Sequence, residues 1–256
     1  QWKNGAMGNA KWTGVRLKDV LEKAGLKKDA VEVTFNGMDL PNYPTVPDFV
    51  KSLSVEHAMD GEVMIAYAMN DQAIPLLNGY PLKLVVPGWY ATYWVGMLNE
   101  IIVTQDTFKG FWMKKAYLKP KGIMNGAEKP DSLKKDLEPV TTMDVRSIFV
   151  TPEPDSVLNI GKEYEIQGLA FDAGHGITKV EVSPDNGTTW QNATLDPNLG
   201  KYSWRRWRYH WTPKEKGDVT FKVRATNANG ETQPEHHWNR SGYLRNEIES
   251  LQLKVK

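Results

Sequence analysis

Residues 76–100, LLNGYPLKLVVPGWYATYWVGMLNE, decide how the N-terminal half of this chain folds. The stretch opens with Asn78-Gly79, a pair that accepts the positive φ of a tight turn at little cost. A short apolar run over 82–86 follows, bounded by prolines on both sides, and it predicts one buried strand. Directly after that strand come four aromatic residues, Trp89, Tyr90, Tyr93 and Trp94.

These four rings admit two interpretations. One is a binding surface at the carboxyl end of a strand, where open sheets place their ligands. The other is an aromatic minicore beneath a loop, which is favoured on physical grounds because large rings mostly serve to bury area. The segment alone leaves both interpretations open.

Length and composition limit the possible classes of protein. The 256 residues have room for one large domain or two small ones. The net charge of +1 argues against nucleic acid as a partner. No apolar run approaches the roughly 18 residues that a membrane span needs. Zero cysteines exclude disulfides, thiolate catalysis and Cys-based metal sites within these residues, while the 10 Trp favour a cofactor-lined cleft or a β-rich module.

The N-terminal half mixes short helices and strands. Apolar positions repeat at helical spacing over 17–24, with Thr13 as a candidate N-cap and Gly25 as the closing residue. The prolines of 40–47 predict an extended loop. We expect a helical turn over 55–59 and strands over 31–35, 62–69, 82–86 and 100–103. The pattern predicts an α+β domain with short helices and a mixed sheet over 1–118.

The composition shifts in the middle of the chain. Residues 119–138 are rich in Lys, Gly, Pro and Asp, so we place an inter-domain linker there. Beyond it the apolar period becomes two, and turn signals occur at 184–187 (PDNG) and 227–230 (NANG). Short strands at this spacing predict an immunoglobulin-like β-sandwich, without its disulfide, over 139–256.

The segment 203–211, SWRRWRYHW, alternates between two kinds of side chain. The aromatic set is Trp207, Tyr209 and Trp211, and the cationic set is Arg206, Arg208 and His210. We interpret the segment as an amphipathic strand rather than a nucleic-acid patch. A subunit contact stays open as an alternative, because Trp and Arg are enriched at the centres of interfaces.

No self-contained catalytic signature occurs in the sequence. The P-loop, G-x-G-x-x-G, G-x-S-x-G and H-E-x-x-H motifs are all missing. Taken singly, Asp39 is typical of a turn cap and Tyr117 of a boundary residue. The residues therefore predict a two-domain protein with an aromatic, Arg-containing cleft, and they do not specify a reaction.

The segment LNGYPLKLVVPGWYATYWV resembles the molybdenum-cofactor domain of the sulfite oxidase family, in its bacterial sulfite dehydrogenase branch, and the likeness runs to the C-terminus. The resemblance implies the C-terminal part of a molybdopterin-binding domain, followed by the Ig-like dimerisation domain of these enzymes. It implies oxidation of sulfite to sulfate by oxygen-atom transfer at Mo-molybdopterin, with electrons passing to a cytochrome c or haem subunit. A homodimer and a periplasmic location are further implications.

The same resemblance implies six cofactor-binding residues, Asp39, Asn78, Lys83, Trp94, Val95 and Gly96. Asp39 follows Gly-Met, as the family's Asp follows a Gly-hydrophobic pair. Asn78 and Lys83 flank Gly-Tyr-Pro, where the family has His and Arg. Lys keeps the positive charge for a phosphate but loses the bidentate fork, and Asn departs from the His. Gly96 stands where the family has a Lys, so it cannot supply an ammonium group.

Four substrate-site residues are also implied, Trp2, Tyr117, Arg240 and Arg245. Trp2 precedes a Gly-Ala pair, as the family's Trp does, and Tyr117 ends the segment FWMKKAY. Its phenol can donate a hydrogen bond to a bound anion. The motif W-N-x-x-G at 238–242 leaves the register of the Arg open, with Arg245 preferred and Arg240 second. Either guanidinium suits a dianion such as sulfite.

One departure concerns the metal. The family holds molybdenum through a cysteine in a motif just upstream of the residues that match Gln1, and this chain has no Cys. We therefore expect the C-terminal portion of a longer enzyme, which alone does not ligate molybdenum as its relatives do. No metal ligand is assigned.

Three alternatives stay open. A sulfane dehydrogenase shares these motifs but acts on carrier-bound sulfur. A non-catalytic dimerisation or binding fragment would depend on the sandwich alone. A sugar-binding sandwich would use the aromatic residues of 204–211.

Overall fold

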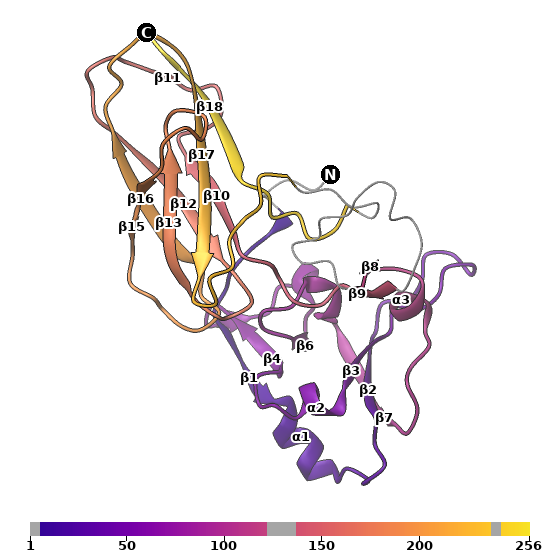
Figure 1. The fold of residues 1–256 in the computed structure, drawn as a ribbon. Helices are drawn as coiled ribbons and strands as arrows, with labels where there is room; N and C mark the ends of the chain where they lie inside the picture. Colours follow the sequence, from indigo (N-terminus) through magenta and orange to yellow (C-terminus); the bar gives the residue numbers. More distant parts are fainter. Residues whose placement is uncertain (1–5, 122–136, 237–241) are drawn as a thin grey trace. The chain divides into compact units, whose positions relative to one another are not determined.

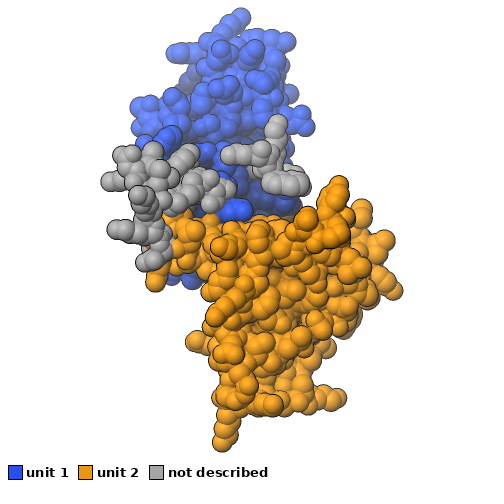
Figure 2. Space-filling model, turned by 90° about the vertical axis from the view of Figure 1, so that its right-hand side faces the viewer, with its two compact units in different colours: residues 1–7, 122–133, 143–256 blue, residues 8–121, 134–142 orange. Residues whose placement is uncertain are grey.

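The structure, a computed structural model, describes residues 6–121, 137–236 and 242–256. These residues form two compact units (Figure 2). The N-terminal unit, orange in Figure 2, takes in residues 8–121 and 137–142. The sandwich unit, blue, takes in the remaining described residues. Residues 139–142, which we placed in the second domain, thus belong to the N-terminal unit, because the carbonyl of Thr141 accepts a hydrogen bond from the Tyr90 N–H at 2.8 Å.

Two small antiparallel sheets and a ribbon build the N-terminal unit (Figure 1). In the first sheet the central strand β4 (Met64–Met69) pairs with β1 (Trp12–Arg16), β5 (Gln72–Ala73) and β6 (Lys83–Val85). In the second, β2 (Glu32–Gly37) lies between β3 (Lys51–Ser54) and β7 (Leu98–Thr104). The ribbon consists of β8 (Leu118–Pro120) and β9 (Leu137–Pro139). The expected strands are thus all present.

The helical segments of the N-terminal unit are short. They are α1 (Leu17–Ala24), α2 (Val55–Ala58), α3 (Phe111–Lys114) and the 3-10 turns η2 (Leu76–Asn78) and η3 (Ala91–Tyr93). Gly25 closes α1 as predicted, with a φ of 84°. Thr13 as N-cap is wrong, because Thr13 pairs with Ala68 inside β1 and the helix begins only after Arg16. No helix in the described ranges is long and apolar enough to cross a membrane.

Three of the four aromatic residues that follow β6, namely Trp89, Tyr93 and Trp94, pack in or against the core of the N-terminal unit. Tyr93 is 1% exposed, and Trp89 stands edge-on to it with ring centroids 4.8 Å apart. Trp89 also stacks on His57 at 4.4 Å, and Trp94 stands edge-on to Trp12 at 5.9 Å. The minicore interpretation is therefore confirmed for these residues.

The second unit is a β-sandwich, as predicted (Figure 1). One sheet has the order β10 (Arg146–Thr151), β12 (Tyr164–Phe171), β16 (Arg205–Trp211), β15 (Thr194–Leu195). The other has the order β11 (Val157–Leu158), β18 (Glu249–Val255), β17 (Gly217–Asn227), β13 (Ile177–Ser183), β14 (Gln191–Asn192). Apolar residues from both sheets form one core cluster. The immunoglobulin-like connection of these strands stays a prediction.

Strand β16 is amphipathic, as the sequence predicts. Trp207 is fully buried and Tyr209 nearly so, while Arg206 and His210 are exposed. Pairing with β12 places His210 opposite Glu165, with 3.3 Å between Nε2 and a carboxylate oxygen. Arg206 and Arg208 on the same face lie 3.8 and 2.5 Å from Asp196, so carboxylates stand beside the cations of this strand.

Candidate cofactor and substrate site

Three loops of the N-terminal unit meet where Gly79 and Gly96 touch. A Cβ on Gly96 would lie 2.9 Å from the Cα of Gly79, so a side chain there would force the backbone to shift. The Gly79 carbonyl accepts a hydrogen bond from the Met97 N–H at 2.9 Å, and the Met97 carbonyl accepts one from the Met38 N–H at 3.0 Å. These contacts define what we call the glycine junction, which holds together the loops after β2, before β6 and before β7.

Lys83 points its ammonium into the glycine junction. Its Nζ donates to the carbonyl of Asn78 at 2.9 Å and lies 3.9 Å from the position that a Gly96 Cβ would take. Burial lowers the pKa of Lys83 below its usual value. A poorly hydrated cation attracts an anion more strongly than a fully solvated one. Lys83 thus supplies positive charge beside Gly96, which has no charge of its own.

Asp39 and Asn78 give the junction its exposed polar side chains. A Cβ on Gly37 would lie 2.5 Å from both the Asp39 Oδ1 and the Gly96 carbonyl oxygen, so the Gly96 backbone approaches the end of β2 closely and the Asp39 carboxylate lies beside it. The structure therefore brings together four of the six predicted cofactor residues, namely Asp39, Asn78, Lys83 and Gly96.

Trp94 and Val95 lie next in the chain but turn their side chains into the core. Val95 is 4% exposed, and its carbonyl accepts a hydrogen bond from the Leu84 N–H at 2.8 Å. The indole N–H of Trp94 donates to the Val86 carbonyl at 2.8 Å. Any cofactor contact at these two positions would come from backbone atoms.

A second cluster in the same unit forms around Tyr117. Its backbone is left-handed, with a φ of 53°, which is uncommon for a tyrosine. The Tyr117 carbonyl accepts a hydrogen bond from the Val140 N–H at 2.8 Å. Its ring packs with Trp112 and Phe49, at centroid distances of 6.1 and 6.4 Å. Contacts on both backbone and ring thus fix the predicted active-site tyrosine.

Lys51 completes this cluster and was not predicted as a site residue from the sequence. The residue is 1% exposed, and its Nζ donates to the Trp112 carbonyl at 2.8 Å. The same atom lies 4.3 Å from the ring centre of Tyr93 and 5.3 Å from that of Tyr117. Burial lowers the pKa of Lys51 from 10.5 to about 8, and burial also raises the pKa of Tyr93.

A signal for Lys51 exists in the segment DFVKSLS. Lys51 alternates with Phe49 and Leu53, so a strand that buries Leu53 also turns Lys51 inward. An inward lysine in a strand is rare enough to mark a site, since lysine is almost never fully buried. The proline-rich loop over 40–47 comes shortly before β3, so the sequence alone did not show where this strand begins or that its residues alternate.

The predicted substrate arginine Arg245 belongs to the sandwich unit. Its Nε lies 2.9 Å from Glu247 and its second terminal nitrogen 3.5 Å from Glu249. Glu249 in turn contacts Arg146 at 2.5 Å. The Arg245 side chain stays 43% exposed, so outward N–H groups remain available. The predicted residues Trp2 and Arg240 lie outside the described residues.

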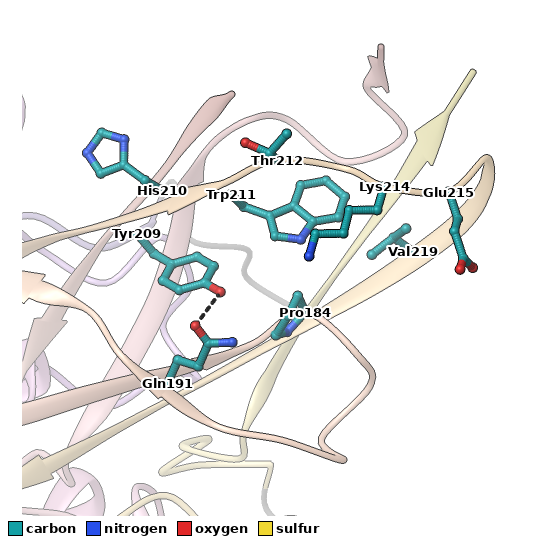
Figure 3. A pocket seen from close by; sticks show the side chains of 9 residues that line it. All are labelled: Pro184, Gln191, Tyr209, His210, Trp211, Thr212, Lys214, Glu215 and Val219. Carbon is teal, nitrogen blue, oxygen red and sulfur yellow. Dashed lines mark hydrogen bonds between the residues drawn. The ribbon is translucent and has the colours of Figure 1, made fainter. Parts of the chain in front are cut away.

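A hollow of about 430 Å³ opens on the sandwich unit (Figure 3). Tyr209 donates its hydroxyl hydrogen to Gln191 Oε1 at 3.1 Å, the dashed line in Figure 3. Trp211 stands edge-on to Phe221, with ring centroids 4.9 Å apart. The rings of Tyr209 and Trp211 are thus fixed by contacts within the sandwich unit, and the hollow does not present them as a flat platform. The hollow therefore gives no support to the sugar-binding alternative.

Two family models match the chain. The oxidoreductase molybdopterin binding domain matches residues 1–112, and the Mo-co oxidoreductase dimerisation domain matches residues 138–255. Their division of the chain agrees with the predicted order of an α+β domain and a β-sandwich.

Curated relatives extend along nearly the whole chain. Mitochondrial sulfite oxidase of Drosophila melanogaster is 30% identical over 99% of this chain and 47% of the relative. The human enzyme is 30% identical over 96% of this chain and 46% of the relative. Nitrate reductase [NADH] 2 of Phaseolus vulgaris is 27% identical over 96% of this chain and 30% of the relative. The chain thus spans about half the length of the sulfite oxidases that it matches.

A solved structure is similar to this chain over both units. The sulfane dehydrogenase SoxCD from Paracoccus pantotrophus aligns with a TM-score of 0.81 and 26% identity, over 96% of this chain and 60% of that chain.

Proposed function

We propose, because the chain belongs to the molybdopterin oxidoreductases of the sulfite oxidase family, that it forms part of an enzyme that oxidises sulfite to sulfate. The matched domain and its relatives indicate Mo-molybdopterin as the cofactor. When bound, that cofactor supplies oxygen-atom transfer and takes up the two electrons of the oxidation. The chain's own residues bind the pterin, orient the substrate and provide positive charge.

The glycine junction is the observation that carries the proposal. Its donor set fits a pyranopterin phosphate: Lys83 offers a poorly hydrated cation, Asp39 an acceptor for ring N–H groups, and Asn78 an amide that both donates and accepts. We assign these three residues to side-chain contacts. Trp94, Val95 and Gly96 are assigned to backbone contacts, because two of them face the core and the third has no side chain.

The described residues that fit the pterin do not offer a comparable site for the metal itself. Within the described residues, no three His, Asp or Glu side chains gather in a way that could hold a metal ion, and the sequence has no cysteine. We infer that a thiolate ligand to molybdenum would come from polypeptide other than these 256 residues.

On the substrate side, we assign Tyr117 as a hydrogen-bond donor to the sulfur oxyanion, with Arg245, Arg240 and Trp2 as further contacts. Arg245 shares its guanidinium with Glu247 and Glu249, so an anion at that side chain has to compete with two carboxylates. This competition makes the second candidate, Arg240, worth testing beside it.

Carrier-bound sulfane sulfur is the second candidate substrate. The likeness to the sulfane dehydrogenase SoxCD over 96% of this chain favours it. Electron transfer to a cytochrome c or haem subunit, a homodimer through the sandwich and a periplasmic location complete the proposal. The match to a dimerisation domain supports the homodimer.

Steady-state oxidation by the full-length, cofactor-loaded protein tests the reaction. Sulfite and a carrier protein bearing a cysteine persulfide would be compared, with cytochrome c as electron acceptor. We expect sulfite-dependent reduction of cytochrome c that falls strongly in Tyr117→Phe. If the protein oxidised the persulfide but not sulfite, carrier-bound sulfane would replace sulfite as the proposed substrate. If it oxidised neither compound, the proposal would be overturned.

A further inference from the structure

Lys51 is a buried charge that the proposed reaction has not yet used. It lies on β3 opposite Phe35, a fully buried residue of the central strand β2, and it faces the same core. Its described contacts are the Trp112 carbonyl and the faces of two tyrosine rings. Burial lowers the pKa of this ammonium. Among the described residues, no carboxylate forms an ion pair with this desolvated ammonium.

Fold stability does not explain such a residue. A buried ammonium is costly unless it is paired, and a methionine of similar length would fill the same space without that cost. Strained or costly groups concentrate at functional sites, where the surrounding structure holds them in place. Tyr117, which lies beneath the same ammonium, has the positive φ of a strained residue.

We propose that Lys51 is a positioning residue for Tyr117. The Lys51 ammonium ties α3 to β3 and lies over the Tyr117 ring. It thereby fixes the phenol and places a buried positive charge beside it. The inference rests on the proposed function, in which Tyr117 contacts the substrate oxyanion. The hydrogen bond to the Trp112 carbonyl fixes the last turn before Tyr117, five residues upstream of it. The ring contact at 5.3 Å then acts on the tyrosine directly.

Other charged groups of the described residues around Lys51 are few. Glu32 on β2 acts on Tyr93, and its carboxylate accepts a hydrogen bond from the Phe108 N–H at 3.0 Å. Asp48 accepts from Asn36 at 2.9 Å, and Lys114 on α3 is exposed. A change in the Tyr117 environment with a midpoint near pH 8 would therefore report on Lys51, since tyrosine itself titrates near pH 10.

A spectroscopic titration tests the contact without any enzyme activity. The 256-residue chain is labelled with ¹³C at tyrosine Cζ, and the Tyr117 signal is assigned by its loss in Tyr117→Phe. In the wild-type chain we expect this signal to shift with a midpoint near pH 8. The step should disappear in Lys51→Met and persist in Lys115→Met, which removes an exposed ammonium two residues from Tyr117. A wild-type Tyr117 signal that is flat between pH 7 and 9 would overturn the proposal, whether or not Lys51→Met folds.

Kinetics of the full-length, cofactor-loaded protein test the consequence for the substrate. Lys51→Met should raise KM for sulfite roughly tenfold, with a smaller change in kcat. Lys51→Arg, which keeps the charge, should raise KM less than Lys51→Met does. Equal KM values in wild type and Lys51→Met would contradict the positioning role. Failure of the wild-type enzyme to oxidise sulfite would refute the proposed function, while the ¹³C titration would still decide on the contact.

Discussion

The sandwich unit and the N-terminal unit bury different kinds of group. The core of the sandwich is a single apolar cluster from two sheets, centred on the fully buried Trp207 and Phe221. The N-terminal unit buries Lys51 among aromatic rings and brings Gly79 and Gly96 into backbone contact. The sandwich therefore has the features of a framework, and the N-terminal unit those of a site. The N-terminal unit thus buries a lysine ammonium, whereas the buried carboxylate of the sandwich unit, Asp172, accepts backbone hydrogen bonds from Gly174 and Gly176.

Removal of the central sandwich ring should have the largest effect on stability. Trp207 packs so closely that a Cβ on Gly168 would lie 2.2 Å from its ring. Trp207→Ala should destabilise the sandwich by about 3–5 kcal/mol through lost burial and the cavity left behind. Hydrogen exchange resolved by segment is the appropriate measurement, because a two-unit chain need not unfold in one step. Equal loss of protection in both units would remove the distinction between them.

Replacement of the buried cation should act in the opposite direction. The pKa of Lys51 is about 8 in the folded chain and near 10.5 when unfolded, so its burial costs about 3 kcal/mol below pH 8. The cost is relieved as the pH rises from 8 to 10.5, since only the unfolded chain then holds the proton. Lys51→Met should thus be more stable than wild type at pH 7. The gain in the free energy of unfolding is reduced by the roughly 1 kcal/mol that the lost hydrogen bond contributes.

Denaturant unfolding of both proteins at pH 7 and pH 10 checks this linkage. The advantage of Lys51→Met should shrink at pH 10. An advantage that is constant with pH would mean that Lys51 has the same pKa in the folded and unfolded chains, so that its burial costs nothing through protonation.

Substitution at the glycine junction should cost less stability but change the site. In Gly96→Ala, the new methyl would lie 2.9 Å from the Gly79 Cα, so the loops must separate at a cost of about 1–3 kcal/mol. Gly61→Ala is the matched control, because its Cβ meets nothing within 4 Å, although its φ of 86° adds backbone strain. Only Gly96→Ala should reduce pterin binding in the full-length protein; equal pterin content in both variants would place the pterin elsewhere.

The smallest effect is expected on the exposed side of the sandwich unit. Glu247→Gln removes one of the two carboxylates beside Arg245, and a partly exposed ion pair is worth at most about 1 kcal/mol. The melting temperature should therefore hardly change. If Arg245 binds sulfite, KM should fall modestly, because one competing carboxylate is gone. A KM that does not change would favour Arg240 as the substrate arginine.

The two units also differ in how well their sequences predicted them. Strand alternation in 203–211 predicted which residues of β16 face the core, because each strand buries one face against the other sheet. In the N-terminal unit the helix over 17–24 was recognisable, but the strand over 12–16 was not. That strand depends on pairing with β4, in which Trp12 lies opposite Met69, and the Gly/Asn-rich sequence before it does not reveal it.

The candidate site shows the same limit. A resemblance in motif placed Asp39, Asn78, Lys83 and Gly96 in one functional set, and the structure brings these residues together. The close approach of Gly79 to Gly96 and the burial of Lys51 were not predicted. The approach of the two glycines depends on a contact between two loops that local patterns do not encode, whereas the alternation in DFVKSLS does carry a signal for the burial of Lys51.

The pterin content of full-length Lys83 variants tests the central claim most directly. Protein would be purified under one set of conditions, and released pterin quantified by fluorescence after oxidation. The glycine junction as a pterin site predicts that Lys83→Met loses most of its pterin while Lys83→Arg, which keeps the charge, retains it. Wild-type pterin content in Lys83→Met would contradict the account.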